Sequence, residues 1–487
     1  MISLQDILYG VALRRRIGPA EVRINALQFD SRKLQPADLF VAVRGWQTDG
    51  HQFIADAIAA GANAIVCEEL PEQQPENVVF LVVENSARAL GVLAANYYHN
   101  PSEEVQVVGV TGTNGKTTVT SLLYRVFTEL GYPCGLLGTT GVRIEGKVVE
   151  STHTTPDALR IQELLAEMRD AGCAYCFMEV SSHAAHQQRI AGIRFAGAVF
   201  TNLTHDHLDY HGSFQNYLLA KKSFFDGLDK DAFALTNIDD RNGTVMLQNT
   251  RARKKSYSLE TKADYRGRIL EKSFEGFTIE TDGQEVFYRL PGVFNAYNML
   301  AVYGTALELE QNKEEVLVAL SKQQSVPGRF ELVQAPGAPT GIVDYAHTPD
   351  ALQNVLETVQ DIRRGAGAIY TVIGCGGDRD TAKRPQMARI AVLLSDWVYL
   401  TNDNPRTEDP EHILDEMETG VPVSGRKKVL RIANRREAIR AAVLNAQPED
   451  IIVVAGKGHE TYQEIQGKRL HFDDREELRN AIKERTA

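Results

Sequence analysis

A glycine-rich stretch near residue 110 has the residues of a phosphate-binding loop. Residues 107–127 read VVGVTGTNGKTTVTSLLYRVF, in which an apolar run leads into glycines, a lysine and two threonines. Apolar positions recur at helical spacing from Thr117, so we expect a strand over 105–110 followed by a helix. Backbone N–H groups and the helix dipole attract phosphate at such a turn. The common G-x-x-x-x-G-K-[ST] pattern has a glycine where this chain has Val110.

The loop offers three kinds of group to a nucleotide. Gly112 and Gly115 let the backbone approach a phosphate closely, and Lys116 supplies a positive charge for the outer phosphates. The hydroxyl of Thr117 can bind Mg²⁺. An ordinary glycine-rich turn is the alternative. We predict instead that the loop binds ATP through the residues Thr111, Gly112, Thr113, Asn114, Gly115, Lys116, Thr117 and Thr118.

Carboxylates and histidines follow two further apolar runs. Glu179 ends the run CFMEV, where it could face the phosphate loop and hold Mg²⁺. The run AGAVFTNL leads into THDHLDYHG, which contains five polar side chains: His205, Asp206, His207, Asp209 and His211. Taken alone, this group could be a zinc site or a solvated polar loop.

Hydrophobic patterns divide the chain into three α/β units. Residues 1–102 predict a small α/β domain, which ends near the polar, proline-containing break YYHNPSEE. Residues 103–330 alternate buried strands with helices, which predicts a central phosphate-loop-type ATPase domain with a parallel sheet. Shorter alternating pieces around Asp282 predict an antiparallel insertion. Residues 331–487 predict a Rossmann-like domain, in which four strands each precede a polar loop at the ligand-binding edge.

The composition limits the class of protein. The chain has 487 residues and a formal charge of −11, which argues against a general nucleic-acid or anionic-membrane binder. No apolar run approaches the roughly 20 residues that span a bilayer, and the N-terminus does not have the pattern of a secretory signal. Five sparse cysteines indicate free thiols, and we attribute the lone C-x-x-C pair to packing. We expect a cytoplasmic monomer that binds small molecules, with no nucleic-acid partner and no membrane insertion.

The stretch TGTNGKTT resembles the phosphate loop of the Mur ligase family, ATP-dependent enzymes that form amide bonds in peptidoglycan synthesis. Folylpolyglutamate synthases are relatives of this family. The resemblance implies that ATP, with Mg²⁺, activates a carboxylate. It extends over essentially the whole chain through motifs in the family's order: a match to N-x-T-x-D-H-x-D, then YLLAKKSFFD, PGVFNAYNMLAV, VPGRFE and VDYAHTPDAL.

These motifs imply roles for further residues. His207 would bind a second Mg²⁺, and Lys221 would carry a carbamate as N6-carboxylysine. The implied catalytic residues are Lys116, Glu179, His207 and Lys221, and the implied metal ligands are Thr117, Glu179, His207 and the carbamate of Lys221. Asn295, Asn298 and Asp344 would lie near the nucleotide. Arg329, in the hinge expected over 325–333, could reach the γ-phosphate.

The first unit resembles the UDP-sugar-binding domain of the ligase that adds the third residue of the stem peptide. Ser31 and Arg32 are the expected contacts to the uridine diphosphate. An anionic UDP-muramoyl dipeptide needs further hydrogen-bond donors. The implied contacts in the central unit are Thr154, Thr155, Ser181, Gln187 and Arg189.

The stretch DNPRTEDP indicates the amino acid that is added. Asp-Asn-Pro-Arg resembles the version of the subfamily that selects meso-diaminopimelate, and lysine-adding relatives differ at the arginine. Diaminopimelate has the shape of lysine plus a second carboxylate, which Arg406 can hold through two parallel N–H bonds. Asp403 and Glu460 suit the distal ammonium group. The expected contacts are Arg379, Asp403, Asn404, Pro405, Arg406, Gly456 and Glu460.

We therefore predict an ATP-dependent ligase that joins meso-2,6-diaminopimelate to the D-glutamate side-chain carboxylate of UDP-N-acetylmuramoyl-L-alanyl-D-glutamate through an acyl phosphate. Three alternatives stay open. An L-lysine-adding ligase would share nearly every feature except the Arg406 loop. A folylpolyglutamate synthase would not need the first unit, and a nucleotide switch would hydrolyse ATP without an amino acid.

Overall fold

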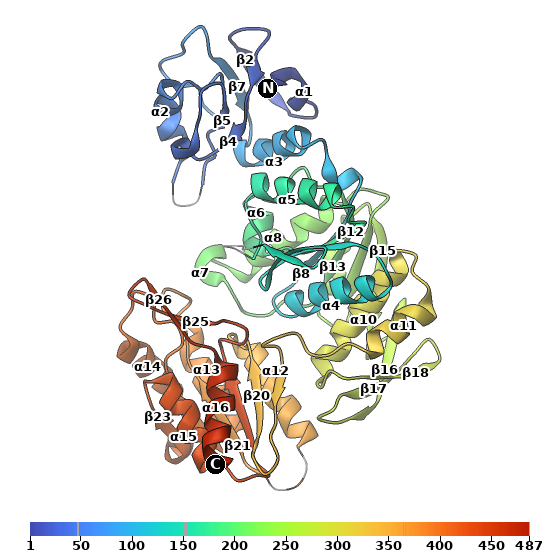
Figure 1. The fold of residues 1–487 in the computed structure, drawn as a ribbon, viewed down its shortest axis with the longest axis vertical. Coiled ribbons are helices and arrows are strands. Elements are labelled where there is room, and N and C mark those ends of the chain that lie inside the picture. Colours follow the sequence, from blue (N-terminus) through green and yellow to red (C-terminus); the bar gives the residue numbers. More distant parts are fainter. Residues whose placement is uncertain (46–47, 150–153, 364, 366, 487) are drawn as a thin grey trace.

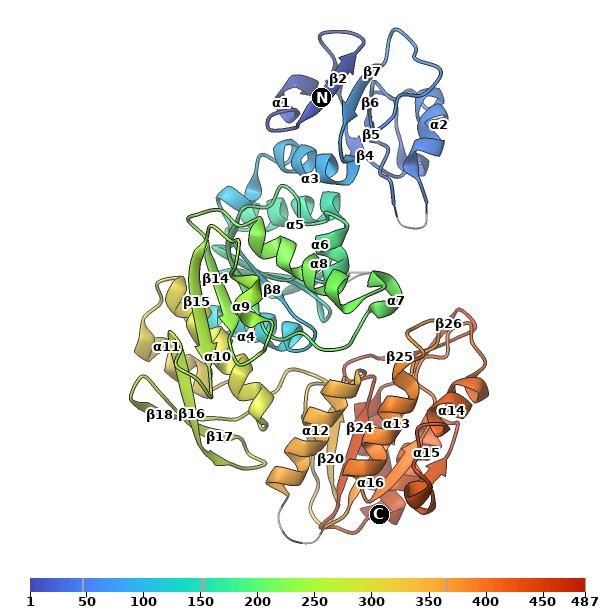
Figure 2. The ribbon, with the colours of Figure 1, turned by 180° about the vertical axis from the view of Figure 1, so that it is seen from behind.

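The computed structural model describes residues 1–45, 48–149, 154–363, 365 and 367–486. Three main sheets follow one another along the long axis of the molecule, from the N-terminal end to the C-terminal end (Figure 1). The view from behind shows the same order (Figure 2). The predicted α/β fold with three domains is confirmed. The domain limits near residues 102 and 330 stay a proposal.

The N-terminal sheet has five strands in the order β2-β7-β6-β5-β4. The strands are β2 (Leu13–Ile17), β4 (Leu27–Gln28), β5 (Leu39–Val41), β6 (Ala64–Cys67) and β7 (Val79–Val83). One face packs on α1 (Leu4–Ile7) and α3 (Ser86–Tyr97), and the other on α2 (Ile54–Ala59). The two short strands β1 (Ile2–Ser3) and β3 (Arg23–Ile24) pair separately. Each face of the sheet therefore has its own small apolar core.

The central sheet has eleven strands in the order β11-β10-β9-β12-β8-β13-β14-β15-β16-β17-β18. Neighbours from β9 to β16 are parallel, as the near-continuous apolar runs predict. The parallel strands are β8 (Gln106–Thr111), β9 (Cys134–Gly138), β12 (Tyr175–Glu179), β13 (Phe195–Phe200), β14 (Phe233–Asn237) and β15 (Arg253–Ser258). The edge strands are β10 (Gly141–Ile144), β11 (Lys147–Val149), β16 (Tyr265–Lys272), β17 (Phe277–Thr281) and β18 (Gln284–Tyr288).

One edge of this sheet is antiparallel. β16, β17 and β18 are antiparallel, and the turn at Asp282 joins the last two, so the predicted insertion is confirmed. Helices cover both faces. One face packs on α4 (Lys116–Glu129), α10 (Val293–Glu308) and α11 (Lys313–Ser321). The other packs on α5 (Ala158–Asp170) and α8 (Phe214–Asp226), with the short helices α6 (Ser182–His186), α7 (Leu208–His211) and α9 (Gly243–Met246) nearby.

The C-terminal sheet has the order β19-β20-β24-β21-β22-β23, with only β19 antiparallel. Its strands are β19 (Glu331–Val333), β20 (Thr340–Asp344), β21 (Ile369–Ile373), β22 (Trp397–Leu400), β23 (Val429–Arg431) and β24 (Ile451–Ala455). One face carries α12 (Pro349–Ile362), α13 (Lys383–Leu394) and α14 (Pro410–Glu418). The other carries α15 (Arg435–Asn445) and α16 (Asp474–Thr486). A hairpin of β25 (Tyr462–Ile465) and β26 (Lys468–His471) follows β24.

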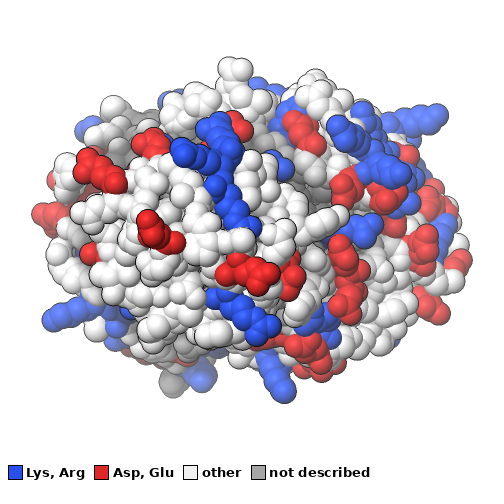
Figure 3. All heavy atoms as spheres, turned by 90° about the horizontal axis from the view of Figure 1, so that it is seen from above, with Lys and Arg blue, Asp and Glu red and all other residues white. Residues whose placement is uncertain are grey.

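The helices, the cysteines and the charged surface can be compared with what the composition predicts. No helix in the described ranges is long and apolar enough to cross a membrane. All five cysteines are buried and free, so Cys173 and Cys176 contribute to packing. At the N-terminal end, basic side chains are interspersed with acidic and uncharged ones (Figure 3).

Candidate active site

The phosphate loop lies between the end of β8 and the start of α4. Gly112 has a φ of +151°, and a Cβ on it would lie 1.9 Å from the Thr201 hydroxyl, so only glycine fits. Gly115 precedes α4 with a φ of +89° and provides no side-chain cap for the helix. The Lys116 ammonium donates to the carbonyl oxygens of Gly112 and Thr113 at 2.9 and 2.8 Å. A helix N-terminus and a cation therefore meet in one loop, as anion binding requires.

A carboxylate and two hydroxyls lie beside this loop. Glu179 is the last residue of β12 and is buried. Its carboxylate accepts hydrogen bonds from the Thr117 hydroxyl at 3.0 Å and from the Thr139 amide at 2.7 Å. The Thr139 hydroxyl donates to that of Thr154 at 3.1 Å, and the Arg329 guanidinium donates to the Thr117 hydroxyl at 3.1 Å. The fold thus gathers predicted ligands of metal, nucleotide and dipeptide around one carboxylate.

The two adjacent lysines of α8 have different surroundings. Lys221 is buried, and its ammonium donates to the Gly112 carbonyl at 2.7 Å. Burial, together with the charge of Lys116, lowers the pKa of Lys221 well below its ordinary value. Lys222 instead forms an ion pair with Asp226 at 2.6 Å. Lys221 is therefore the lysine that contacts the phosphate loop, and its carbamylation stays a prediction.

The histidines after β13 have different partners. His207, with a φ of +53°, lies 3.4 Å from Asp206 and packs edge-on against His183. Burial lowers the pKa of His207 to about 4, so its imidazole is neutral at pH 7. His205 instead lies 3.3 Å from Asp380 of the C-terminal domain. No three His, Cys, Asp or Glu side chains of the described segments are grouped as metal ligands, so these residues do not form one zinc cluster.

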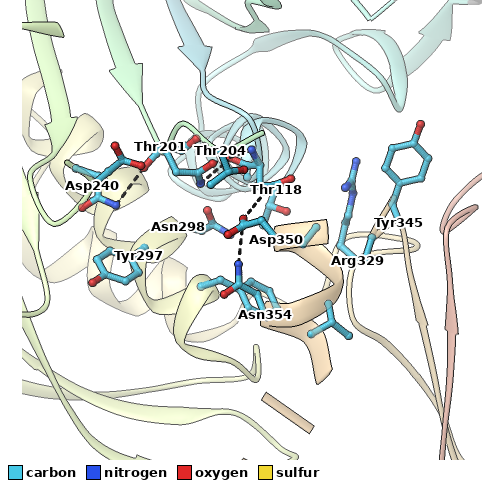
Figure 4. Close-up of a pocket in the computed structure, with 18 of the residues that line it drawn as sticks. Thr118, Thr201, Thr204, Asp240, Tyr297, Asn298, Arg329, Tyr345, Asp350 and Asn354 are labelled. Atoms are coloured by element: carbon cyan, nitrogen blue, oxygen red, sulfur yellow. Dashed lines mark hydrogen bonds between the residues drawn. The ribbon is translucent and has the colours of Figure 1, made fainter. Parts of the chain in front are cut away.

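A pocket of about 300 Å³ lies between the central and C-terminal domains, next to the phosphate loop (Figure 4). The central domain contributes the loop, the segments after β13 and β14, and α10, and the C-terminal domain contributes α12 and the end of β20. The Asn114 amide donates to the Asp350 carboxylate at 2.9 Å, which joins the loop to α12. The residues labelled in Figure 4 are Thr118, Thr201, Thr204, Asp240, Tyr297, Asn298, Arg329, Tyr345, Asp350 and Asn354.

Two of the residues predicted for ATP line this pocket from the hinge side. The Arg329 guanidinium carbon lies 4.5 Å from the centre of the Tyr345 ring, which holds it in place. The Asp344 carboxylate accepts a hydrogen bond from the Phe330 amide at 2.7 Å. Burial raises the pKa of Asp344 to about 6. The contacts of Arg329 and Asp344 therefore connect the hinge to the wall of the pocket.

Asn295 does not line the pocket. Its side chain donates to the Pro291 carbonyl at 2.8 Å and accepts a hydrogen bond from the Asn298 amide at 3.2 Å. Asn298, one helical turn further along α10, does line the pocket. Asn295 therefore lies behind the residue that faces the nucleotide site.

The predicted UDP contacts lie in the N-terminal domain. Ser31 and Arg32 belong to η1, a 3₁₀ turn over Ser31–Lys33. Asp30 caps this turn, and the exposed Arg32 guanidinium donates twice to its carboxylate at 2.8 Å. A diphosphate would have to replace or share this partner. The role of both residues stays a prediction.

Four of the five predicted dipeptide contacts form one polar network. The Thr155 hydroxyl donates to the backbone carbonyl of Glu179 at 2.8 Å. Arg189 donates to the Thr155 carbonyl at 2.9 Å and to the side-chain oxygen of Gln187 at 2.6 Å. Ser181 caps α6 and lies 3.4 Å from the Thr155 hydroxyl. The network adjoins the carboxylate beside the phosphate loop.

The predicted amino-acid contacts lie on three loops, which follow β21, β22 and β24 of the C-terminal sheet. Lys457 donates to the Asn404 side chain and to the Glu460 carboxylate, each at 3.0 Å, and Asn404 donates to Glu460 at 2.8 Å. Burial and the charge of Asp403 raise the pKa of Glu460. Gly456 has a φ of +118°, and a Cβ there would lie 2.7 Å from the Asp403 carboxylate. The loops therefore approach too closely for a side chain at this position.

Arg406 and Arg379 differ in how firmly they are held. Arg406 has a φ of +51°, its amide donates to the Glu464 carbonyl at 3.0 Å, and its guanidinium donates to the Gly377 carbonyl at 2.6 Å. A Cβ on Gly377 would lie 2.0 Å from the Pro405 carbonyl, so the two loops touch. Arg379 is exposed and has a longer contact of 3.3 Å to a backbone carbonyl. Arg406 is the more rigid of the two cations.

Known proteins match this chain over nearly all of its length. Sequence models match under the descriptions "Mur ligase family, catalytic domain" over 23–98, "Mur ligase middle domain" over 110–306 and "Mur ligase, glutamate ligase domain" over 328–458. The UDP-N-acetylmuramoyl-L-alanyl-D-glutamate–2,6-diaminopimelate ligase of Cytophaga hutchinsonii is 55% identical over 97% of this chain and 98% of that protein. The chain belongs to the Mur ligase family. The protein of the same name from Parabacteroides distasonis is 52% identical over 98% of both chains.

Solved structures agree with this Mur ligase assignment. One solved ligase, whose name is again UDP-N-acetylmuramoyl-L-alanyl-D-glutamate–2,6-diaminopimelate ligase, is 34% identical in sequence. Its TM-score is 0.71, and the match covers 100% of this chain and 99% of that one. The three-sheet arrangement of this Mur ligase is therefore the arrangement of a known member of its family.

The structure adds residues to the site of this Mur ligase that sequence reasoning missed. Asp350 and Asn354 face the pocket from α12, and Tyr297 faces it from α10. Lys457 forms the centre of the network in the amino-acid loops. Asp350 lies inside the motif VDYAHTPDAL and Tyr297 inside PGVFNAYNMLAV, while Lys457 lies in the stretch GKGHE that contains Glu460. Their places in these stretches were the signal that could have identified them.

Proposed function

We propose that this Mur ligase uses ATP to join meso-2,6-diaminopimelate to the D-glutamate side-chain carboxylate of UDP-N-acetylmuramoyl-L-alanyl-D-glutamate, a step of peptidoglycan synthesis. The observation that carries the proposal is the arrangement of the three amino-acid loops. One loop holds the Arg406 guanidinium for a carboxylate. The buried acid Asp403 and the half-buried acid Glu460 are suited to an ammonium group. Relatives that are 55% and 52% identical carry the name of diaminopimelate ligases, which supports the same substrate.

The residues beside the phosphate loop suit Mg²⁺. The Thr117 hydroxyl and the Glu179 carboxylate are hard oxygen ligands that lie 3.0 Å apart, and His207 is neutral at pH 7 and can offer a lone pair. The lowered pKa of Lys221 keeps more of its amine neutral, which is the form that adds to CO₂ and becomes an anionic carbamate. Mg²⁺, when bound, would neutralise charge on the phosphates during transfer.

The chain holds the reacting groups while the substrates react in two steps. Lys116 and the N-terminal amides of α4 bind the outer phosphates, and Arg329 approaches them from the hinge. In the first step, the D-glutamate carboxylate takes the γ-phosphoryl group and ADP leaves. In the second, the amine of diaminopimelate attacks the acyl phosphate, loses a proton and displaces phosphate. Catalysis thus depends on positioning and charge stabilisation.

The other substrate contacts follow from the same proposal. Ser31 and Arg32 bind the uridine diphosphate, and the network of Thr155, Gln187 and Arg189 binds the dipeptide. We propose a cytoplasmic monomer, and the five free, buried cysteines suit a reducing compartment.

Phosphate release tests the proposed function. The protein is incubated with Mg·ATP and UDP-N-acetylmuramoyl-L-alanyl-D-glutamate, with meso-diaminopimelate or L-lysine in parallel. We expect release to need both substrates and to favour diaminopimelate strongly. A preference for lysine would keep the mechanism and refute the substrate. Release that ignores both amino acids would indicate a nucleotide switch instead.

A further inference from the structure

A buried arginine near the start of α13 joins two of the amino-acid loops. Arg384 is the second residue of this helix, and its side chain is fully buried. Its guanidinium donates to both carboxylate oxygens of Glu408, each at 2.9 Å, and to the Gly376 carbonyl at 3.2 Å. Glu408 lies in the loop after β22, two residues beyond Arg406, and Gly376 lies in the loop after β21. Arg384 therefore holds both loops from inside the domain.

The Glu408 carboxylate connects the same two loops a second time. It accepts a hydrogen bond from the Asp378 amide at 2.5 Å. The Asp378 carboxylate accepts in turn from the Thr407 hydroxyl at 2.7 Å and from the Thr407 amide at 3.3 Å. Hydrogen bonds from Arg384 lower the pKa of Glu408, so this carboxylate is ionised at pH 7. The series of bonds that begins at Arg384 therefore ends at Thr407, the residue next to Arg406.

The guanidinium of Arg406 lies on the loop that this pair holds. A Cβ on Gly376 would lie 2.9 Å from a guanidinium nitrogen of Arg406, so the guanidinium packs directly on this glycine. It also donates to the Gly377 carbonyl at 2.6 Å, and the Gly377 amide donates to the Asn404 carbonyl at 2.9 Å. A displacement of the loop after β21 would therefore move the guanidinium with it.

Arg384 has a second acidic partner with a different position. Its guanidinium lies 2.7 Å from the carboxylate of Glu416, which belongs to α14. The start of a helix disfavours a cation, and a buried guanidinium needs an anion beside it, so both acids stabilise the charge of Arg384. Glu408, however, belongs to the loop of Arg406. The two acids thus share one arginine and differ in their connection to the amino-acid loops.

We propose that Glu408, held by Arg384, is a positioning residue that fixes Arg406 for the second carboxylate of the amino acid and so sets the preference for diaminopimelate over lysine. The inference rests on the proposed ligase function and adds no chemical step to it. A guanidinium that is held in place before the substrate arrives loses less freedom when the substrate binds. The buried ion pair therefore pre-organises the cation that recognises the substrate.

Replacing Glu408 by glutamine tests this role. The glutamine keeps the size of the side chain but has one oxygen where the carboxylate has two. Phosphate release is measured at saturating Mg·ATP and UDP-dipeptide, with either amino acid varied. We expect KM for diaminopimelate to rise about tenfold and kcat to stay within about threefold, because a misplaced guanidinium weakens binding of the amino acid. For L-lysine, kcat/KM should change by less than about threefold.

Matched variants separate positioning from a general loss of stability. Glu416→Gln removes the other acid of the same arginine and should leave the ratio of kcat/KM for the two amino acids within about twofold. In Arg406→Ala, the added change Glu408→Gln should alter this ratio by less than about twofold, because its effect passes through the missing guanidinium. Arg384→Lys cannot bond both oxygens of Glu408, so it should show the same loss if Glu408→Gln does not fold.

Three results would overturn the proposal for Glu408. These are a ratio that Glu408→Gln leaves within about twofold, an equal loss for both amino acids, and equal effects of Glu408→Gln and Glu416→Gln. A failure of the proposed function would appear in the unmodified protein, as phosphate release that does not favour diaminopimelate. A failure of the Glu408 inference would appear only when the variants are compared with that protein.

Discussion

Replacing Arg406 by alanine should remove most of the preference for diaminopimelate over lysine. The guanidinium has five N–H donors, and the Gly377 carbonyl accepts from one of its nitrogens at 2.6 Å. The remaining donors can hold the second carboxylate of diaminopimelate, which L-lysine lacks. One charge-assisted hydrogen bond is worth about 1.5–3 kcal/mol. The loss of one bond therefore lowers kcat/KM for diaminopimelate about 10- to 150-fold, and the loss of two lowers it further.

The assay is phosphate release at saturating Mg·ATP and UDP-dipeptide, with either amino acid varied. We expect kcat/KM for L-lysine to change by less than about threefold, because lysine has no group that pairs with Arg406. Arg440→Ala serves as a control, since this exposed arginine pairs with Glu484 on the surface. An equal loss for both amino acids, or an unchanged ratio, would refute the interpretation of DNPR.

A glycine variant separates recognition from stability. Arg406 adopts a φ of +51°, which costs an L-residue about 1–2 kcal/mol relative to an ordinary helical conformation. Arg406→Gly removes the same guanidinium as Arg406→Ala but relieves this backbone strain. The two variants should therefore share one specificity, while the glycine variant unfolds at the higher denaturant concentration.

Three further predictions concern the phosphate loop and its neighbours. Gly112→Ala places a Cβ 1.9 Å from a threonine hydroxyl and should lower kcat/KM about 100-fold. Gly131→Ala is the control, because a Cβ there has open space around it and the φ is +91°. This control should lose about 1–2 kcal/mol of stability and leave activity unchanged. Burial raises the pKa of Asp344 from 3.8 to about 6, so the native state retains a proton that the unfolded chain releases. Urea unfolding measures the free energy of unfolding of the wild type and of Asp344→Asn at each pH. The difference in favour of the wild type should therefore be greatest below about pH 4 and fall by at most about 3 kcal/mol as the pH rises to about 6. Parallel pH profiles of the two proteins would contradict this. If Lys221 carries a carbamate, removal of CO₂ should reduce activity and bicarbonate should restore it. Lys221→Ala should lose at least about 100-fold in kcat, and Lys222→Ala should change kcat little. Activity that does not depend on CO₂ would argue against the carbamate.

Contacts within one loop were the easiest part of the site to predict. The phosphate loop is continuous in sequence, and strand, glycines and helix follow in the order that the apolar pattern indicates. The amino-acid loops were found for the same reason, because each directly follows a buried strand of the C-terminal sheet. Asp403 and Glu460 then meet because the carboxyl ends of parallel strands lie at one edge.

Contacts that depend on helix rotation or domain placement could not be predicted. Asn295 and Asn298 are both on α10, and only the packing of that helix decides that Asn298 faces the pocket. The bond from Asn114 to Asp350 joins two domains, so no local pattern announces it.

The pocket has one wall in each of two domains, and this has a consequence for inhibitors. A compound that touches only the wall of α10 would bind equally well whatever the position of the C-terminal domain. A compound that bridges to Asp350 would hold the two domains in one orientation. Since the amino-acid loops belong to the same C-terminal domain, the potency of a bridging compound would depend on how much amino acid is present. Its inhibition would then be competitive with respect to ATP and mixed with respect to the amino acid.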